Sequence, residues 1–166
     1  LILAMIVLGL KKYTKDPITG FTLLAQSGSS RKNYIGETSS EKYIITENEN
    51  IRENEAFLYL SNIFSELKLN TPRIFAVNDD RTIYIQQYLG EKTLSQILTE
   101  ENQQFESVRN LVKLTLTRLY ELQIKTQNKI DYKQAFEYES YDELPIIHDL
   151  YYFKNFLVDV LELPYH

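Results

Sequence analysis

The residues of this chain best suited to chemistry form a short polar turn, Ser27-Gly28-Ser29-Ser30-Arg31-Lys32. Small side chains between two extended segments let backbone N–H groups approach an anion, as in phosphate-binding nests. The adjacent cations Arg31 and Lys32 add positive charge to such a site. The turn is not a Walker A loop, because no Gly-Lys-Ser/Thr follows and a strand is expected next. With one glycine, an ordinary hairpin turn is the alternative interpretation.

Composition narrows the classes of function. The chain has 166 residues, no cysteine, two histidines and a net charge of −5. Without cysteine there is no disulfide framework, thiolate nucleophile or Cys-ligated metal site. The negative charge argues against a broad nucleic-acid footprint. Residues 1–46 carry six basic against three acidic side chains, so an anion site fits this part of an otherwise acidic chain.

The apolar run Leu1–Leu10 is too short for a transmembrane helix, which needs about 20 residues. Lys11 and Lys12 follow the run, whereas a signal peptide has its charges before the apolar stretch. We therefore predict a packed N-terminal helix and a cytoplasmic protein, with an interfacial anchor as the alternative.

The following segments alternate between strand and turn patterns. Asp16–Gly20 has the composition of a turn, and a cluster of apolar residues at helical spacing around Phe57 predicts a helix of about five turns. Glu53 and Glu55 stand in its first turns, where the helix dipole favours acids. Five strands are predicted, at Phe21–Ala25, Arg31–Gly36, Tyr43–Ile45, Arg73–Val77 and Thr82–Tyr88.

After Leu89-Gly90 the pattern is helical. We predict a short helix with Thr93 as its N-cap, a long helix from Phe105 to Leu122, and a last amphipathic helix from Ile146 to Leu161. Strands with one helix followed by helices alone indicate an α+β chain. The expected division is an N-terminal helix and turn (1–19), a five-stranded antiparallel lobe with one helix (20–90), and an incomplete helical lobe (91–166), with a hinge between the two lobes near residues 88–92.

This order of elements is the layout of a protein-kinase-like N-lobe, in which a loop covers nucleotide phosphates and a helix glutamate positions a phosphate-binding lysine. The chain resembles the aminoglycoside phosphotransferase/choline-kinase-like family. The most similar branch is that of bacterial phosphotransferases related to Ser/Thr protein kinases, which includes cell-wall sugar kinases. The segments that carry the resemblance are Gln26-Ser-Gly-Ser-Ser-Arg-Lys-Asn-Tyr34, Arg52–Leu60, Thr71–Phe75, Tyr88–Leu94 and His148–Lys154.

The resemblance implies roles for individual residues. Glu53 or Glu55 is the helix glutamate. Lys42 precedes the apolar run of the third strand, whereas a kinase places its lysine after it, so Arg31 or Lys32 could replace Lys42 as the phosphate cation and Lys42 could be a surface residue. The remaining cofactor-binding residues are Ser27, Gly28, Ser29 and Ser30 at the ATP phosphates and Gln87, Tyr88 and Leu89 at the adenine.

No catalytic or metal-binding residue is predicted. A kinase-like enzyme needs a catalytic-loop Asp, a nearby Asn and a further Asp for magnesium. The pair His148-Asp149 has the wrong order for that loop, since Leu150 stands where the Asp belongs. The magnesium ligands are therefore expected outside this chain, and the chain alone is expected to be inactive.

The sequence thus predicts the N-terminal part of an ATP- and magnesium-dependent phosphotransferase that acts on a small hydroxylated molecule, a sugar rather than an antibiotic. Its expected partners are a nucleotide and that substrate, without nucleic acid or membrane, and a second copy through an exposed lobe face. The alternative is a non-catalytic kinase-like or other α+β module that binds a nucleotide or a partner. A membrane-associated antibiotic-modifying kinase would require Leu1–Leu10 to be an exposed anchor.

Overall fold

The computed structural model describes residues 2–25, 30–99 and 105–163. Contacts divide the chain into two compact units, Leu1–Ile130 and Asp131–His166. The expected hinge at residues 88–92 lies inside the first unit.

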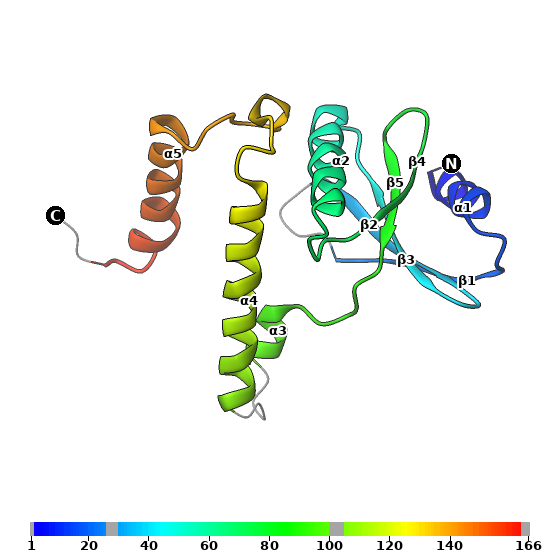
Figure 1. Ribbon diagram of the computed structural model, residues 1–166, viewed down its shortest axis with the longest axis horizontal. Coiled ribbons are helices and arrows are strands. Elements are labelled where there is room, and N and C mark those ends of the chain that lie inside the picture. Colours follow the sequence, from blue (N-terminus) through cyan, green and yellow to red (C-terminus); the bar gives the residue numbers. More distant parts are fainter. Residues whose placement is uncertain (1, 26–29, 100–104, 164–166) are drawn as a thin grey trace. The chain divides into compact units, whose positions relative to one another are not determined.

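The first unit is built on a five-stranded antiparallel sheet with the order β1-β2-β3-β5-β4 (Figure 1). Helix α2 is inserted between β3 and β4, and helix α1 precedes β1. The α+β class and the protein-kinase-like arrangement of five strands with one inserted helix are thereby confirmed. The elements are α1 (Ile2–Tyr13), β1 (Ile18–Leu23), β2 (Lys32–Thr38), β3 (Lys42–Glu47), α2 (Ile51–Glu66), β4 (Ile74–Val77) and β5 (Ile83–Gln87).

The two faces of the sheet are covered by different helices (Figure 1). Ile45 and its cross-strand partner Ile85 belong to a buried core cluster with Leu10 of α1. The next pair along the same strands, Thr46 and Tyr84, points to the opposite face because strand side chains alternate. There Phe57 of α2 stacks on Tyr84, with ring centroids 5.1 Å apart.

Helix α1 is held to the sheet by its C-terminal end. Leu10 is fully buried, and the ring of Tyr13 stacks on Phe75 at 5.4 Å and meets Tyr43 edge-on at 5.6 Å. Burial, followed by a hydrogen bond to Glu41, raises the pKa of Tyr43 to about 12. These contacts confirm the packed N-terminal helix. No described helix is long and apolar enough to cross a membrane.

Gly36 of β2 lies where α1 approaches the sheet. A Cβ at this position would lie 2.6 Å from Ile45 Cδ1 and 2.9 Å from Leu10 Cδ2. We expect Gly36→Ala to lower the free energy of unfolding by about 1–2 kcal/mol. The cost of overpacking exceeds the stabilisation that alanine gives by lowering the entropy of the unfolded chain. Gly9→Ala is the matched control, because a Cβ there meets nothing within 4 Å and a helical Ala is favoured over Gly by about 1 kcal/mol. Denaturant titration should give opposite signs for the two variants; equal signs would contradict this packing.

The turn expected at Asp16–Gly20 is wrong in its second half. Ile18, Thr19 and Gly20 already belong to β1, and a register irregularity between Ile18 and Gly20 accommodates them. The β-branched pair Ile18-Thr19 favours extended backbone. Pairing with Thr38 and Glu37 of β2 therefore overrides the turn composition of this segment.

Two helices follow the sheet in the first unit, α3 (Leu94–Thr99) and α4 (Phe105–Thr126). The prediction of Thr93 as N-cap is confirmed. The hydroxyl of Thr93 accepts a hydrogen bond from Gln96 N–H at 3.2 Å, and Gln96 Oε1 accepts one from Thr93 N–H at 2.7 Å. This reciprocal pair is a capping box.

The second unit contains a 3-10 turn, η1 (Tyr132–Gln134), helix α5 (Glu143–Phe153) and a π-helical segment, η2 (Lys154–Val158). The single α-helix expected from Ile146 to Leu161 is therefore wrong at both ends. Asp159 N–H donates to the carbonyl of Lys154 at 2.8 Å, and the side chains of the same two residues pair at 2.8 Å. A pair five residues apart matches the i→i+5 spacing of a π-helix.

Candidate phosphate-binding site

The structure separates the two adjacent cations of the polar turn. Arg31 lies on the α2 face of the sheet, and Lys32 lies on the opposite face, because successive residues of an extended chain point to opposite sides. Lys32 Nζ lies 3.8 Å from Glu47 Oε2, and the hydroxyl of Tyr34 donates to the same carboxylate oxygen at 3.4 Å. Of these two cations, Arg31 is the one that faces α2.

Arg31 forms an ion pair with Glu53 in the first turn of α2. One terminal guanidinium nitrogen of Arg31 lies 2.7 Å from Glu53 Oε1. The guanidinium also lies over the ring of Phe57, 5.4 Å from its centroid. The side chains of Arg31 and Glu53 are 23% and 19% exposed, so the pair is shielded more than a surface ion pair. A planar guanidinium in this position is suited to bind phosphate oxygens in pairs.

Several contacts fix the place of Glu53. Asn50 is the N-cap of α2, and its side-chain oxygen accepts from Glu53 N–H at 3.1 Å. The amide of Asn48, just beyond β3, donates to Glu53 Oε2 at 2.8 Å and to Asn54 Oδ1 at 3.1 Å. Asn48 and Asn54 are 3% and 0% exposed. The glutamate is thus held by its backbone and by one carboxylate oxygen.

Glu55, the other candidate for the helix glutamate, points elsewhere. It pairs with Arg81, in the turn between β4 and β5, through both carboxylate oxygens. This hydrogen bonding to Arg81 lowers the pKa of the Glu55 carboxyl. Of the two glutamates, Glu53 is therefore the one brought to Arg31.

Lys42 lies at the opposite end of β3 from Arg31. The strand rise places these ends about 17 Å apart. Lys42 Nζ lies 2.8 Å from Glu37 Oε1 and 3.6 Å from Glu91 Oε1, and 5.8 Å from the ring centroid of Tyr88. Its hydrogen bond to Glu37 raises the pKa of Lys42. The structure thus brings Lys42 to the expected hinge and not to the Arg31–Glu53 pair.

Of the expected hinge residues, Gln87 is the last residue of β5, and Tyr88 and Leu89 follow it. The backbone N–H of Gln87 donates to the carbonyl of Arg73 at 2.9 Å, which closes the edge of the sheet. Tyr88 is half-buried, and desolvation raises the pKa of its hydroxyl. Leu89 is 63% exposed, and Gly90 adopts a φ of +116°, a conformation that suits glycine. β5 therefore ends at Gln87, one residue before the predicted end of the strand at Tyr88, and Leu89-Gly90 lies beyond the sheet.

A polar cluster on the α2 face of the sheet was not predicted. The hydroxyl of Thr46 donates to Asn33 Oδ1 at 2.7 Å and accepts from Gln86 Nε2 at 3.1 Å. These three residues lie on adjacent strands beside Tyr84, and Thr46 follows the apolar run of β3, where the resemblance would place a lysine. The only sequence signal for this cluster is the polar residue that interrupts each apolar strand.

Ser27, Gly28 and Ser29 lie outside the described residues. Ser30 is exposed and, with Lys32, lines a polar hollow at the end of β2 and β3 whose other residues are Glu47, Asn48, Glu49 and Asn50. In the part of the chain that the structure describes, no three His, Asp or Glu side chains gather in a group that could hold a metal ion.

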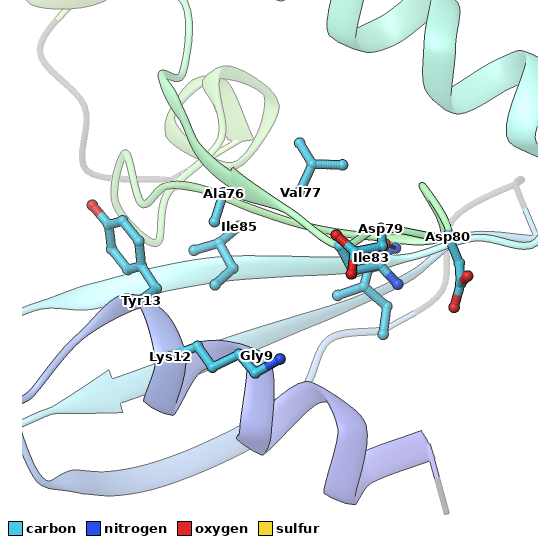
Figure 2. A pocket seen from close by; sticks show the side chains of 10 residues that line it. Gly9, Lys12, Tyr13, Ala76, Val77, Asp79, Asp80, Ile83 and Ile85 are labelled. Atoms are coloured by element: carbon cyan, nitrogen blue, oxygen red, sulfur yellow. Dashed lines mark hydrogen bonds between the residues drawn. The ribbon is translucent and has the colours of Figure 1, made fainter.

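A second hollow, of about 550 Å³, lies on the other face of the sheet, between α1 and the hairpin of β4 and β5 (Figure 2). Figure 2 shows Tyr13 at one end of the hollow and Asp79 and Asp80 at the other, with Lys12 on the helix between them. Two carboxylates against one ammonium do not suit a polyphosphate. The Arg31–Glu53 pair, on the α2 face, is therefore the stronger candidate site.

Among solved structures, the chain is similar to a phosphotransferase complex. No protein-family model matches the chain, and no curated protein matches it. A solved chain from the "Structure of the streptomycin-ATP-APH(2")-IIa ternary complex" is 16% identical with a TM-score of 0.40. The match covers 60% of this chain and 33% of the solved chain, so this chain spans about a third of that protein's length. A similarity of this size assigns neither a substrate nor an activity.

Proposed function

We propose that this chain is the nucleotide-binding part of an ATP-dependent phosphotransferase that acts on a small hydroxylated molecule, a sugar by preference. The observation that carries the proposal is the ion pair of Arg31 with Glu53, at the end of β2 and the start of α2. In a kinase-like lobe, a cation held by a helix glutamate contacts the phosphates. Here the cation comes from the polar turn, immediately before β2, instead of from the third strand.

The described residues fit ATP at both ends of the sheet. Arg31 supplies charge-assisted hydrogen bonds to the phosphates, next to the positive N-terminus of α2. At the hinge, the N–H of Gln87 already donates to Arg73, so backbone groups of Tyr88 and Leu89 are the ones proposed to border the adenine. Lys42 lies beside this segment, paired with Glu37 and Glu91, and has no proposed contact with the nucleotide. The bound nucleotide would supply the transferable phosphoryl group, with magnesium held by residues outside the described set.

Titration calorimetry of this chain with ATP tests the proposal. We expect weak, saturable binding of ATP and weaker binding of AMP, since the triphosphate provides the contacts to Arg31. Inorganic triphosphate controls for binding of phosphate charge alone, and should bind less tightly than ATP because it lacks the adenine. A folded chain that binds neither ATP nor triphosphate would overturn the proposal. Equal affinity for ATP and triphosphate would contradict the proposed adenine contacts and support only a site for anions.

A non-catalytic module that binds a nucleotide is the second candidate. The cluster of Thr46, Asn33 and Gln86, near the expected place of the third-strand lysine, favours it. Phosphoryl transfer from ATP to a panel of sugars, assayed with the full-length gene product, separates the two functions. Sugar-dependent release of ADP supports the enzyme, and nucleotide binding without transfer supports the module.

A further inference from the structure

We propose that Asn48 is a positioning residue for the phosphate site. Its amide holds one oxygen of Glu53 and so sets how strongly that carboxylate binds Arg31. The inference rests on the proposed function, because it concerns the same Arg31–Glu53 pair.

The hydrogen bonds of Asn48 leave its side chain one orientation. Nδ2 donates to Glu53 Oε2 at 2.8 Å and to Asn54 Oδ1 at 3.1 Å, while Oδ1 accepts from Asn50 N–H at 3.1 Å. A flipped amide would place its donor against the N–H of Asn50 and its acceptor against two oxygens. With 3% exposure, water cannot replace these partners easily. The Asn48 amide is therefore a fixed donor aimed at Glu53.

This donor divides the carboxylate of Glu53 between two partners. Oε2 is held by Asn48, and Oε1 lies 2.7 Å from Arg31. Carboxylates favour bidentate pairing with guanidinium groups when both oxygens are available. Without the amide, Glu53 is expected to turn both oxygens toward Arg31 and to compete more strongly with phosphate for its N–H donors. Asn48 thus limits the competition between an internal carboxylate and the ligand.

Contacts that do not involve the Asn48 side-chain amide fix its backbone. Asn54 Nδ2 donates to the carbonyl of Asn48 and to the carbonyl of Arg81, both at 2.8 Å. The backbone N–H of Asn48 donates to the carbonyl of Thr82 at 2.9 Å. A substitution at position 48 therefore leaves these three hydrogen bonds, which join the end of β3 to α2 and to the turn of β4 and β5. This separation makes a positioning role testable apart from folding.

The test compares Asn48→Ala, Asn48→Asp and the control Asn62→Ala. Asn62 is exposed on α2 and its amide bonds to Glu66 at 3.0 Å, away from Arg31. ATP affinity is measured by calorimetry between pH 5 and pH 8, with thermal unfolding to establish that each variant is folded. Asn48→Ala is expected to weaken ATP binding about tenfold at every pH, and Asn62→Ala to leave it unchanged. Asn48→Asp is expected to weaken binding more at pH 8 and to regain affinity toward pH 5, as one of two adjacent carboxylates takes up a proton.

A pH profile that changes only in Asn48→Asp is not expected of a purely structural residue. Folded Asn48 variants that bind ATP like the parent chain, with the same pH profile, would overturn the inference and leave the proposed function intact. If the parent chain does not bind ATP, the proposed function fails instead. The NMR signal of the Arg31 side-chain N–H then tests the inference alone: it should shift in Asn48→Ala and not in Asn62→Ala, and an unmoved signal overturns it. If Asn48→Ala does not fold, Asn48→Ser replaces it in the same comparisons.

Discussion

Arg31→Ala is expected to weaken ATP binding by roughly thirtyfold, because it removes the cation that α2 holds at the end of β2. Hydrogen bonds to charged groups contribute about 1.5–3 kcal/mol each, and 1.4 kcal/mol corresponds to tenfold in affinity. Loss of one such interaction, after allowance for 23% exposure of the side chain, gives about 2 kcal/mol. Calorimetry on the purified chain measures this change directly.

Lys42→Ala is the matched control for charge. It removes a lysine on the same face of the sheet but at the hinge end of β3, where Glu37 and Glu91 pair with it. We expect its ATP affinity to stay within about twofold of the parent chain, since an exposed ion pair contributes about 0–1 kcal/mol. Arg31→Lys should recover part of the affinity, because the charge remains and the paired N–H geometry does not. A larger loss of ATP affinity in Lys42→Ala than in Arg31→Ala would contradict a phosphate site at Arg31 and indicate one at the hinge end of β3.

Asn54→Ala is expected to produce the largest loss of stability among these substitutions, about 3 kcal/mol. Asn54 is fully buried, and its amide serves the carbonyls of Asn48 and Arg81, which belong to different loops. Its oxygen also accepts from the Asn48 amide. Alanine leaves these buried polar groups without a partner, which costs more than the hydrogen bonds themselves contribute.

Denaturant titration of Asn54→Ala measures this loss. The midpoint temperature of thermal unfolding should fall by about 10 °C for a chain of this size. Asn62→Ala on the same helix is the control and should change the free energy of unfolding by less than about 0.5 kcal/mol, as exposed substitutions do. Similar losses in the two variants would show that the buried hydrogen bonds of Asn54 contribute little to the free energy of unfolding. The network would then be a local cap instead of a tie between loops.

The fold could be predicted because its elements carry strong local patterns. Apolar residues at helical spacing defined α2, and β-branched and aromatic residues defined β3 and β5. The turn at Asp16–Gly20 was wrong because local composition cannot report pairing with β2, which makes Ile18–Gly20 a strand. The end of α5 was wrong for a similar reason: apolar spacing does not distinguish an α-helix from the π-helical segment at Lys154–Val158.

For the candidate site, the sequence predicted the charged residues but not which of them come together. Whether Arg31 or Lys32 faces α2 depends on strand register, and a shift of one residue exchanges the two faces. The choice between Glu53 and Glu55 needed the position of Arg81, 26 residues beyond Glu55. The asparagine network stayed unseen because Asn54 meets a carbonyl 27 residues away. Long-range partners of polar residues leave no local pattern in a sequence.

The stack of Arg31, Phe57 and Tyr84 has a practical consequence for spectroscopy. The guanidinium lies over the face of Phe57, and the ring of Phe57 stacks on Tyr84. The chain has no tryptophan and no cysteine. Phe57→Trp would therefore introduce a single indole directly beneath the cation, in a protein with no competing indole emission. Any ligand that draws the guanidinium away from the ring would change the fluorescence of that indole, which makes the stack an optical sensor of where Arg31 is.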